Sequence, residues 1–470
     1  MVFSSPSFLF IFLPVTVLLS RLFHGRKGRN AFLAAAGLIF YSFGQLSALP
    51  LLLLSVLISY AAGLLMLRRD NPRYRKNIML SAVAAHLLIL ALFKYIPPMN
   101  SVLPIGISFY TFHGISYVVD VYRGKSRPEK DPVALLLYIS FFPRLISGPI
   151  VEYSDFESQL ENSEVSAERT AYGIIRFVEG FAKKMLIASV AAKAADHVFN
   201  ISAVSAAAAA SVLDFRLAWL GAAAYAIQIY FDFSGYSDMA IGLSAMFGFS
   251  TAENFDLPYA ALSVREFWRR WHISLSSWFR DYLYIPLGGS RKGRVRAAAN
   301  RMLVFLCTGI WHGAGMNYLL WGLCHGALVS LEGAGIIPTE KLQKSFVGRL
   351  VSRIYTLLSV VLLFVIFRAQ SLGAAWEIIS SMFRFCRFDS AVPELAGLLN
   401  GSMITVLIAG FLLSGRLMAK LRPVLQSKIS ACSSSVAFLI VAVLVAVLLF
   451  VVSLMSMSSS GFSPFIYFQF

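Results

Sequence analysis

Long, continuously apolar runs, such as Val436 to Met455, constrain the fold of this chain more than any other feature. A run of this length without charge can cross the hydrocarbon core of a bilayer as a helix. The 470 residues are 58% hydrophobic and 14% charged, whereas soluble domains carry about 25% charged residues. A membrane β-barrel would instead show short alternating segments. The sequence therefore predicts an all-α, polytopic membrane protein whose solvent is the lipid bilayer.

The formal net charge is +17, and the basic residues cluster in short loops between the apolar runs. Such loops are typical of the cytoplasmic side of a membrane protein, so no nucleic-acid partner is expected. Anionic lipid, or the anionic head group of a substrate, would also favour them. The four cysteines, Cys307, Cys324, Cys386 and Cys432, form no CxxC pair. We therefore expect neither a disulfide framework nor a zinc site.

The positions of the basic loops predict a topology. At the N-terminus the positive charges follow the apolar run, which is typical of an uncleaved first span with its N-terminus outside. The basic loops at His24–Arg29, Arg68–Lys76 and Asp120–Lys130 then all lie in the cytoplasm. Phe32 to Leu67 is expected to form two short spans that turn near Gln45 to Pro50. Pro132 to Ile150 is broken by prolines and glycine and is expected to be re-entrant.

The remainder of the chain continues this pattern. Leu217 to Phe249 is too long for one span, and we expect an interruption at FDFSGYSD. We predict about 11 transmembrane helices, plus re-entrant or interfacial helices. An odd number of spans would leave the C-terminus in the cytoplasm. The whole chain, 1–470, is expected to form one polytopic domain, with a catalytic core at about 100–335 and C-terminal helices at about 350–470.

Two histidines, His312 and His325, lie in the apolar stretch GIWHGAGMNYLLWGLCHG, where an imidazole is costly without a purpose. They are 13 positions apart and no HxxxH or HExxH pattern is present, so we expect no metal site. Glycines around His312 leave space for a ligand, and a neutral imidazole there can act as general base on an alcohol. A structural histidine fits the same residues. His325 is expected to be a packing or hydrogen-bonding residue.

His272 lies in REFWRRWHISLSSWFRDYLYIPLGG, where aromatic and basic residues interleave. On one helix this pattern gives an aromatic side and a cationic side, as in an amphipathic helix at the membrane interface. The same arginines, among them Arg269 and Arg280, suit a cationic mouth that receives a phosphate-bearing ligand. The two interpretations are compatible.

Carboxylates in apolar surroundings form a third feature. Asp232 and Asp238 are separated by about 240° around a helix, so they share no face unless Gly235 breaks it. We expect them to cap helices or to pair with arginines of the 265–301 region. His113 and Asp120 are two turns apart on one face, and we expect a buried hydrogen-bonded pair.

Several longer motifs resemble the membrane-bound O-acyltransferase (MBOAT) family, and within it the bacterial alginate O-acetyltransferase branch (alginate O-acetylation protein I type). The resemblance covers most of the chain. The motifs are LPIGISFYTF, FFPRLISGPI, YFDFSGYSDMAIG, ENFDLPY, EFWRRWHISLSSWFRDYLYIPLGG and GIWHGAGMNYLLWG.

The resemblance implies helices around a central passage, His312 of the WHG motif as the catalytic residue, and His272 as the second family histidine. The remaining candidate residues, which we expect to bind substrate, are Trp311, Asn254, Arg269, Arg280, Asp232 and Asp238.

The resemblance also implies the function, which is transfer of an acetyl group from a cytoplasmic thioester across the cell inner membrane, for O-acetylation of an extracellular or periplasmic polysaccharide. The donor that it implies is acetyl-CoA or an acyl-carrier thioester, and we expect no bound cofactor and no metal. A periplasmic or exported acetyltransferase is the partner that the resemblance implies. D-alanyl or other acyl transfer, and a transporter or flippase without bond chemistry, are the alternatives.

Overall fold

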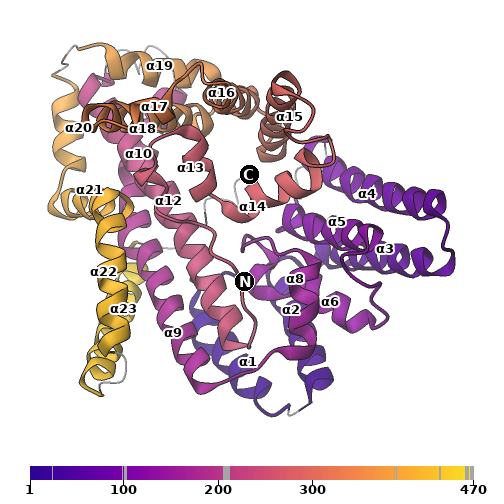
Figure 1. The fold of residues 1–470 in the computed structure, drawn as a ribbon. Coiled ribbons are helices and arrows are strands. Elements are labelled where there is room, and N and C mark those ends of the chain that lie inside the picture. The colour runs from indigo at the N-terminus through magenta and orange to yellow at the C-terminus, as the bar shows by residue number, and fades with distance from the viewer. Residues whose placement is uncertain are drawn as a thin grey trace. The chain divides into compact units, whose positions relative to one another are not determined.

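The computed structural model describes residues 1–23, 25–97, 99, 103–204, 212–385, 387, 389–432, 436–460 and 465 (Figure 1). Throughout these residues the regular structure is helical, with no strand. The predicted all-α class is therefore confirmed. The chain divides into two compact units: Met1–Gly180 with Tyr236–Glu253, and Phe181–Gly235 with Asn254–Phe470. Each is described separately.

The helices of the first unit are η1 (Phe8–Phe12), α1 (Leu13–Ser20), α2 (Arg26–Gln45), η2 (Leu46–Ala48), α3 (Leu49–Arg68), α4 (Pro72–Tyr95), α5 (Ile107–Arg123), α6 (Pro132–Ser140), α7 (Phe142–Leu145), α8 (Tyr153–Asn162) and most of α9 (Ala167–Ala182). The break at η2 falls where the turn near Gln45 to Pro50 was predicted. Pro132 to Ile150 is likewise broken, between α6 and α7.

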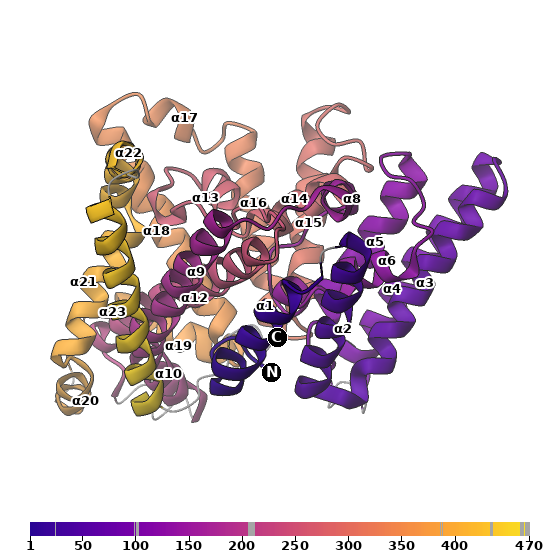
Figure 2. The ribbon, with the colours of Figure 1, turned by 90° about the horizontal axis from the view of Figure 1, so that it is seen from below.

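Helices α3, α4 and α5 pack on one another, as Figures 1 and 2 both show. His86 of α4 lies between them, with its ring nitrogens 3.3 and 3.0 Å from the hydroxyls of Ser55 and Ser59 on α3. His113 of α5 is buried, but neither ring nitrogen has a hydrogen-bond partner among the described residues. The expected pair with Asp120 is thus wrong. Seven positions align two Cβ atoms on a helix face, yet leave about 10 Å of rise between them.

The helices of the second unit are η4 (Lys183–Ala188), α10 (Ser189–Val204), most of α12 (Phe215–Met246), η5 (Pro258–Ala260), α13 (Val264–Arg270), α14 (Ile273–Phe279), η6 (Arg280–Tyr284), α15 (Arg294–His312), α16 (Met316–Gly333), α17 (Thr339–Leu342), α18 (Phe346–Arg368), α19 (Leu372–Phe383), α20 (Ala391–Leu398), α21 (Gly401–Ser414), α22 (Arg416–Cys432) and α23 (Val436–Ser460). Two expectations are corrected here. Helix α12 runs without interruption through FDFSGYSD. The segment from Arg265 to Gly289 is not one amphipathic helix, because it breaks at His272.

Glycines allow the closest helix packing in this unit, between α15 and α16, which lie side by side in Figures 1 and 2. A Cβ on Gly309 would lie 2.6 Å from the carbonyl oxygen of Tyr318, and one on Gly322 would overlap the carbonyl of Phe305. Small residues of this kind let two backbones approach. The close approach fixes the end of α15, where His312 is the last helical residue.

Four helical stretches of the described chain are long and apolar enough to cross a membrane, namely 26–68, 72–95, 346–368 and 440–459. The bent pair α20 and α21, at 74°, would make a fifth. Many leucines, isoleucines and valines on these helices are exposed, as in a lipid-facing surface. The chain is thus a multi-pass membrane protein. The number of about 11 spans stays a prediction.

Candidate active site

His272 lies in a tight break between α13 and α14, and its backbone is left-handed, with φ 45° and ψ 56°. Non-glycine residues adopt this region uncommonly, although histidine does so more often than most, and such strain is often found at functional sites. Two backbone hydrogen bonds close the loop that precedes it. The Asp256 N–H donates to the Arg270 carbonyl, and the Ile273 N–H donates to the Asn254 carbonyl, both over 2.9 Å.

The side chain of Asn254 determines the tautomer of His272. Its Oδ1 accepts from the backbone N–H of Ser274 (3.1 Å) and from the Ser274 hydroxyl (2.9 Å). A backbone N–H can only donate, so the atom facing it is the amide oxygen. The same oxygen lies 3.3 Å from Nδ1 of His272, which must therefore carry the proton. Nε2 is then the basic nitrogen of a neutral ring, and burial lowers the pKa of His272 to about 3.

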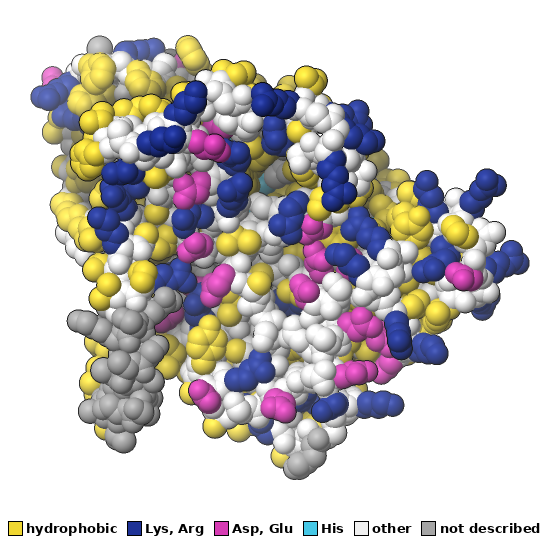
Figure 3. Space-filling view, viewed as in Figure 1, with side chains coloured by type: hydrophobic (Ala, Val, Ile, Leu, Met, Phe, Trp, Pro, Cys, Tyr) yellow, Lys and Arg dark blue, Asp and Glu magenta, His cyan; other side chains and the backbone are white. Residues whose placement is uncertain are grey.

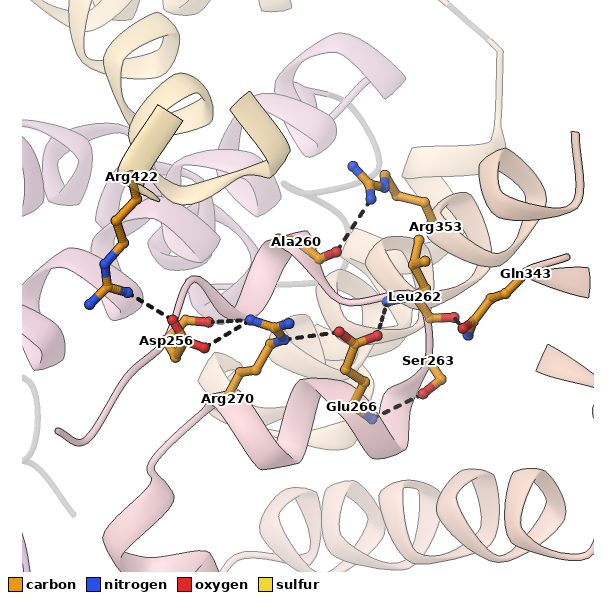
Figure 4. Close-up of polar contacts among 9 residues, drawn as sticks. All are labelled: Asp256, Ala260, Leu262, Ser263, Glu266, Arg270, Gln343, Arg353 and Arg422. Atoms are coloured by element: carbon orange, nitrogen blue, oxygen red, sulfur yellow. Dashed lines mark hydrogen bonds and ion pairs between the residues drawn. The ribbon is translucent and has the colours of Figure 1, made fainter. Parts of the chain in front are cut away.

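An ion-pair network on the other side of the loop holds its shape (Figure 4). Arg270 binds the carboxylates of Asp256 (2.9 Å) and Glu266 (3.0 Å). Arg422 of α22 pairs with the second oxygen of Asp256 at 2.8 Å. Glu266 also accepts from the Leu262 N–H and donates its own backbone N–H to the Ser263 hydroxyl, which caps the start of α13.

A buried carboxylate anchors the start of α13. Glu332, at the end of α16, accepts from the backbone N–H groups of Val264 and Arg265, each over 2.8 Å. A negative charge at this position satisfies two N–H groups that have no partner within the helix. The α13–α14 segment is thus fixed both to its own preceding loop and to α16.

His312 is buried and surrounded by aromatic rings. The ring centroids of Trp311, Phe367 and Trp321 lie 4.6, 4.9 and 5.2 Å from its own. Asn317 donates to the carbonyl oxygens of Phe367 (3.3 Å) and Ala369 (3.0 Å), and so fixes the end of α18 against this site.

The structure brings His272 and His312 to one small cavity, although they are 40 positions apart in the sequence. The cavity measures about 10 Å³, which is room for about one water molecule. The remaining lining is apolar or aromatic: Ile229, Trp268, Trp271, Leu275, Trp321, Phe364 and Phe367. Two imidazoles in so apolar a cavity can accept or donate protons where little water competes.

His325 does not line this cavity, and it has a partner of its own. Its Nδ1 accepts the indole N–H of Trp268 over 3.1 Å. The expectation of a hydrogen-bonding residue is therefore confirmed. Trp268 also packs edge-on against Phe305, at 5.1 Å, and Trp321, at 5.7 Å.

A second, larger cavity of about 550 Å³ adjoins α13, α14 and α15. Its polar lining consists of four arginines, Arg265, Arg269, Arg280 and Arg301, together with Ser276, Ser277, Tyr284 and Thr308. Arg265 pairs with Glu340 and Arg280 with Asp281. Arg269 and Arg301 form no ion pair with any residue in the described ranges.

More positive charge surrounds the larger cavity. The side chains of Arg291, Lys292, Arg294 and Arg296, which precede or begin α15, are exposed. Figure 3 shows Lys and Arg side chains gathered over α15 and α17. A cavity lined by guanidinium groups beside such a surface suits a phosphate-bearing molecule.

The two aspartates of YFDFSGYSD find other partners than expected. Asp232 pairs with the buried Lys184 at 2.7 Å, and Asp238 pairs with Arg176 at 2.6 Å. Both cations precede the 265–301 region, so the expected pairing with its arginines is wrong. No group of His, Cys, Asp and Glu within the described residues is arranged to hold a metal ion.

Comparison with known proteins gives the family. The sequence profile of the membrane-bound O-acyltransferase family matches residues 36–372. The chain belongs to this family. It is 38% identical to the probable alginate O-acetylase AlgI of Pseudomonas putida over 502 residues, which span the full length of both proteins. The MBOAT resemblance and the O-acyltransferase class, both predicted from the sequence, are confirmed.

Two further relatives have other names. The peptidoglycan O-acetyltransferase of Helicobacter pylori is 32% identical over 86% of this chain and 85% of its own length. The teichoic acid D-alanyltransferase of Bacillus subtilis is 31% identical over 57% of this chain and 67% of its own length. All of these names describe acyl transfer.

Within this MBOAT chain the structure groups the candidate residues. His272, His312, Asn254 and Trp311 belong to the surroundings of the small cavity, and Arg269 and Arg280 to the larger one. Asp232 and Asp238 lie in separate ion pairs. Sequence reasoning missed the aromatic walls and the carboxylate of Glu332. The aromatic residues of RRWHISLSSWF were visible as a cluster, but nothing in the sequence distinguished a cavity wall from an interfacial belt.

Proposed function

We propose that this protein transfers an acetyl group from a thioester donor to a polysaccharide hydroxyl, across the inner membrane of the cell. The observation that carries the proposal is the small cavity lined by both His272 and His312, next to the arginine-lined cavity. The residues around 100–335 would form its catalytic core. The names of the Pseudomonas putida and Helicobacter pylori relatives support acetyl as the acyl group and alginate or a related polysaccharide as the acceptor.

The donor would bind in the larger cavity. Acetyl-CoA and acyl-carrier thioesters both present a phosphate on a pantetheine arm, and Arg269 and Arg301 have guanidinium groups available for it. Donor entry from the cytoplasm follows from the basic residues around this cavity, since basic segments of membrane proteins favour that side.

The chemical step requires a base and a group that orients the reactants. His312 removes the proton of the acceptor hydroxyl as the hydroxyl oxygen forms a bond to the thioester carbonyl carbon. His272 orients a reactant, because its unprotonated Nε2 can accept a hydrogen bond from a hydroxyl group. When the tetrahedral intermediate collapses, the carbon–sulfur bond breaks and the thiolate takes the proton from His312. The ester and a free thiol are the products.

Replacement of His312 tests the proposal. We expect His312→Ala to lower ester acetate on the secreted polysaccharide by about 100-fold or more, the range for loss of a general base. His197→Ala is the control, because His197 is half-exposed and pairs with Glu394 away from either cavity. Acetylation at the wild-type level in His312→Ala, with equal protein in the membrane, would contradict the assignment.

A second substitution at His312 distinguishes an enzyme from a transporter. A transporter needs only a hydrogen-bonding group in its passage, so His312→Gln would retain transport. A general base cannot be replaced by an amide, and we expect His312→Gln to be as inactive as His312→Ala. D-alanyl transfer, as in the Bacillus subtilis relative's name, is distinguished by supplying a D-alanyl thioester and an acetyl thioester to the same membranes.

A further inference from the structure

Two side chains, Trp268 and Leu275, line both cavities. They therefore form the wall between the space proposed for the donor and the space that contains His312. The direct route for an acyl group from the larger cavity to the histidines runs past this pair. The wall comes from α13 and α14, on either side of the strained turn at His272.

The histidine side of this wall has very little room. The cavity of about 10 Å³ would have to widen even for an acetyl group. Most of its lining cannot retreat easily, because the rings of Trp268, Trp271, Trp321, Phe364 and Phe367 are buried and mostly pack against one another. Leu275 is buried as well, at 2% exposure, but it is the one flexible aliphatic side chain of the wall.

His325 keeps the other half of the wall in place. The indole N–H of Trp268 is bound to His325 Nδ1, and the ring is held between Phe305 and Trp321. A buried indole N–H that lost this acceptor would have to find another, which requires the ring to move.

We infer that Trp268, held by His325, and Leu275 form a size filter that restricts the transferred acyl group to about two carbons. The inference rests on the proposed function and names the specificity of the same site. An extra methylene in an apolar pocket of fixed size typically changes selectivity by about 10- to 200-fold. A propionyl donor should thus react at least about 10-fold more slowly than acetyl, and butyryl more slowly still.

The test uses the full chain in proteoliposomes with acetyl, propionyl and butyryl thioesters of 4′-phosphopantetheine and an alginate oligosaccharide. Release of the free thiol measures kcat/KM for each donor. We expect Leu275→Ala to raise the propionyl-to-acetyl ratio by about 10-fold or more. Ile273→Ala is the matched control: it removes the same number of carbons from the same helix, but Ile273 lines only the larger cavity. The propionyl-to-acetyl ratio of Ile273→Ala should equal that of the wild type.

His325 is tested as a positioning residue. His325→Leu removes the acceptor for the Trp268 indole, and we expect the propionyl-to-acetyl ratio to rise. His325→Gln still offers an oxygen acceptor and should restore the wild-type ratio. A residue that only filled space would give equal ratios in the two variants.

The possible failures are distinguishable. Thiol release that is unchanged by His312→Ala would overturn the proposed function itself. If thiol release depends on His312 but the wild-type enzyme uses the butyryl donor as fast as the acetyl donor, only the size filter is overturned. An unchanged propionyl-to-acetyl ratio in Leu275→Ala would also overturn only the size filter. If Leu275→Ala elutes as an aggregate in size-exclusion chromatography, Leu275→Val is expected to give a smaller rise in the ratio, and an unchanged ratio there rejects the filter.

Discussion

Replacement of Asn254 by alanine should disable the site without touching either histidine. The turn at His272 has no side-chain cap of its own, so Asn254 supplies the cap for α14 through the Ser274 N–H. Loss of a cap costs about 1 kcal/mol. The buried Nδ1–H of His272 loses its acceptor, which adds about 1–2 kcal/mol. The left-handed backbone of His272, which costs about 1 kcal/mol to maintain, is then free to relax.

These three terms sum to about 3 kcal/mol in favour of a relaxed turn. A free-energy change of this size lowers the population of the active arrangement about 100-fold. We therefore expect Asn254→Ala to lower the rate of thiol release from the acetyl donor by about 10- to 100-fold. The assay is run in proteoliposomes at matched protein content. A rate within twofold of the wild type would refute the argument, because it would show that the turn is held without Asn254.

Replacement of Asn254 by aspartate should make the rate of thiol release depend on pH. A carboxylate still accepts the three hydrogen bonds, but its negative charge favours the protonated imidazole and raises the pKa of His272. In the wild type that pKa, at about 3, keeps the ring neutral from pH 5 to 8. In the variant the neutral ring is lost as pH falls through the raised pKa. We expect a new acidic limb in the pH–rate profile, and a wild-type profile would contradict this.

Two further predictions concern the helices that support the site. Gly309→Val places a Cβ 2.6 Å from the Tyr318 carbonyl, so α15 and α16 must separate; we expect loss of the monodisperse peak in size-exclusion chromatography, and a normal peak with normal activity would contradict the packing argument. Lys184→Met leaves Asp232 buried without its cation, at a cost of about 3–5 kcal/mol; we expect a marked fall in the thermal inactivation temperature, and recovery in the double variant Lys184→Met with Asp232→Leu if the pair is structural.

The sequence was sufficient for the class of fold and for choosing the two histidines that line the small cavity, for different reasons. Apolar runs report membrane helices directly, because lipid forces the backbone to satisfy its own hydrogen bonds. The choice of His272 and His312 came from the motifs that contain them, because the residues around His312 fit a general base and a structural histidine equally well.

The failures share a physical cause, namely tertiary contacts that override local patterns. An interruption of α12 was expected at FDFSGYSD, but the one glycine there, Gly235, costs a helix only about 1 kcal/mol, and the residues around it are buried. No glycine or proline marks the break between α13 and α14 at His272 in the sequence. It depends on Asn254, 18 positions before His272, and on Glu332, whose carboxylate binds the Arg265 N–H from 67 positions further along the chain. No window of sequence around His272 contains those partners.

The two sides of the His272 loop differ in how much each contact matters. On the outer side, Arg270, Asp256 and Glu266 are 30–48% exposed, so each ion pair is screened and contributes little by itself. Arg270 has two carboxylate partners and Asp256 has two arginines, so one lost contact leaves the others. On the inner side a single oxygen of Asn254 caps the helix, sets the tautomer of His272 and holds its strained backbone. Substitutions in the outer network should therefore be tolerated one at a time, whereas the inner contact has no substitute.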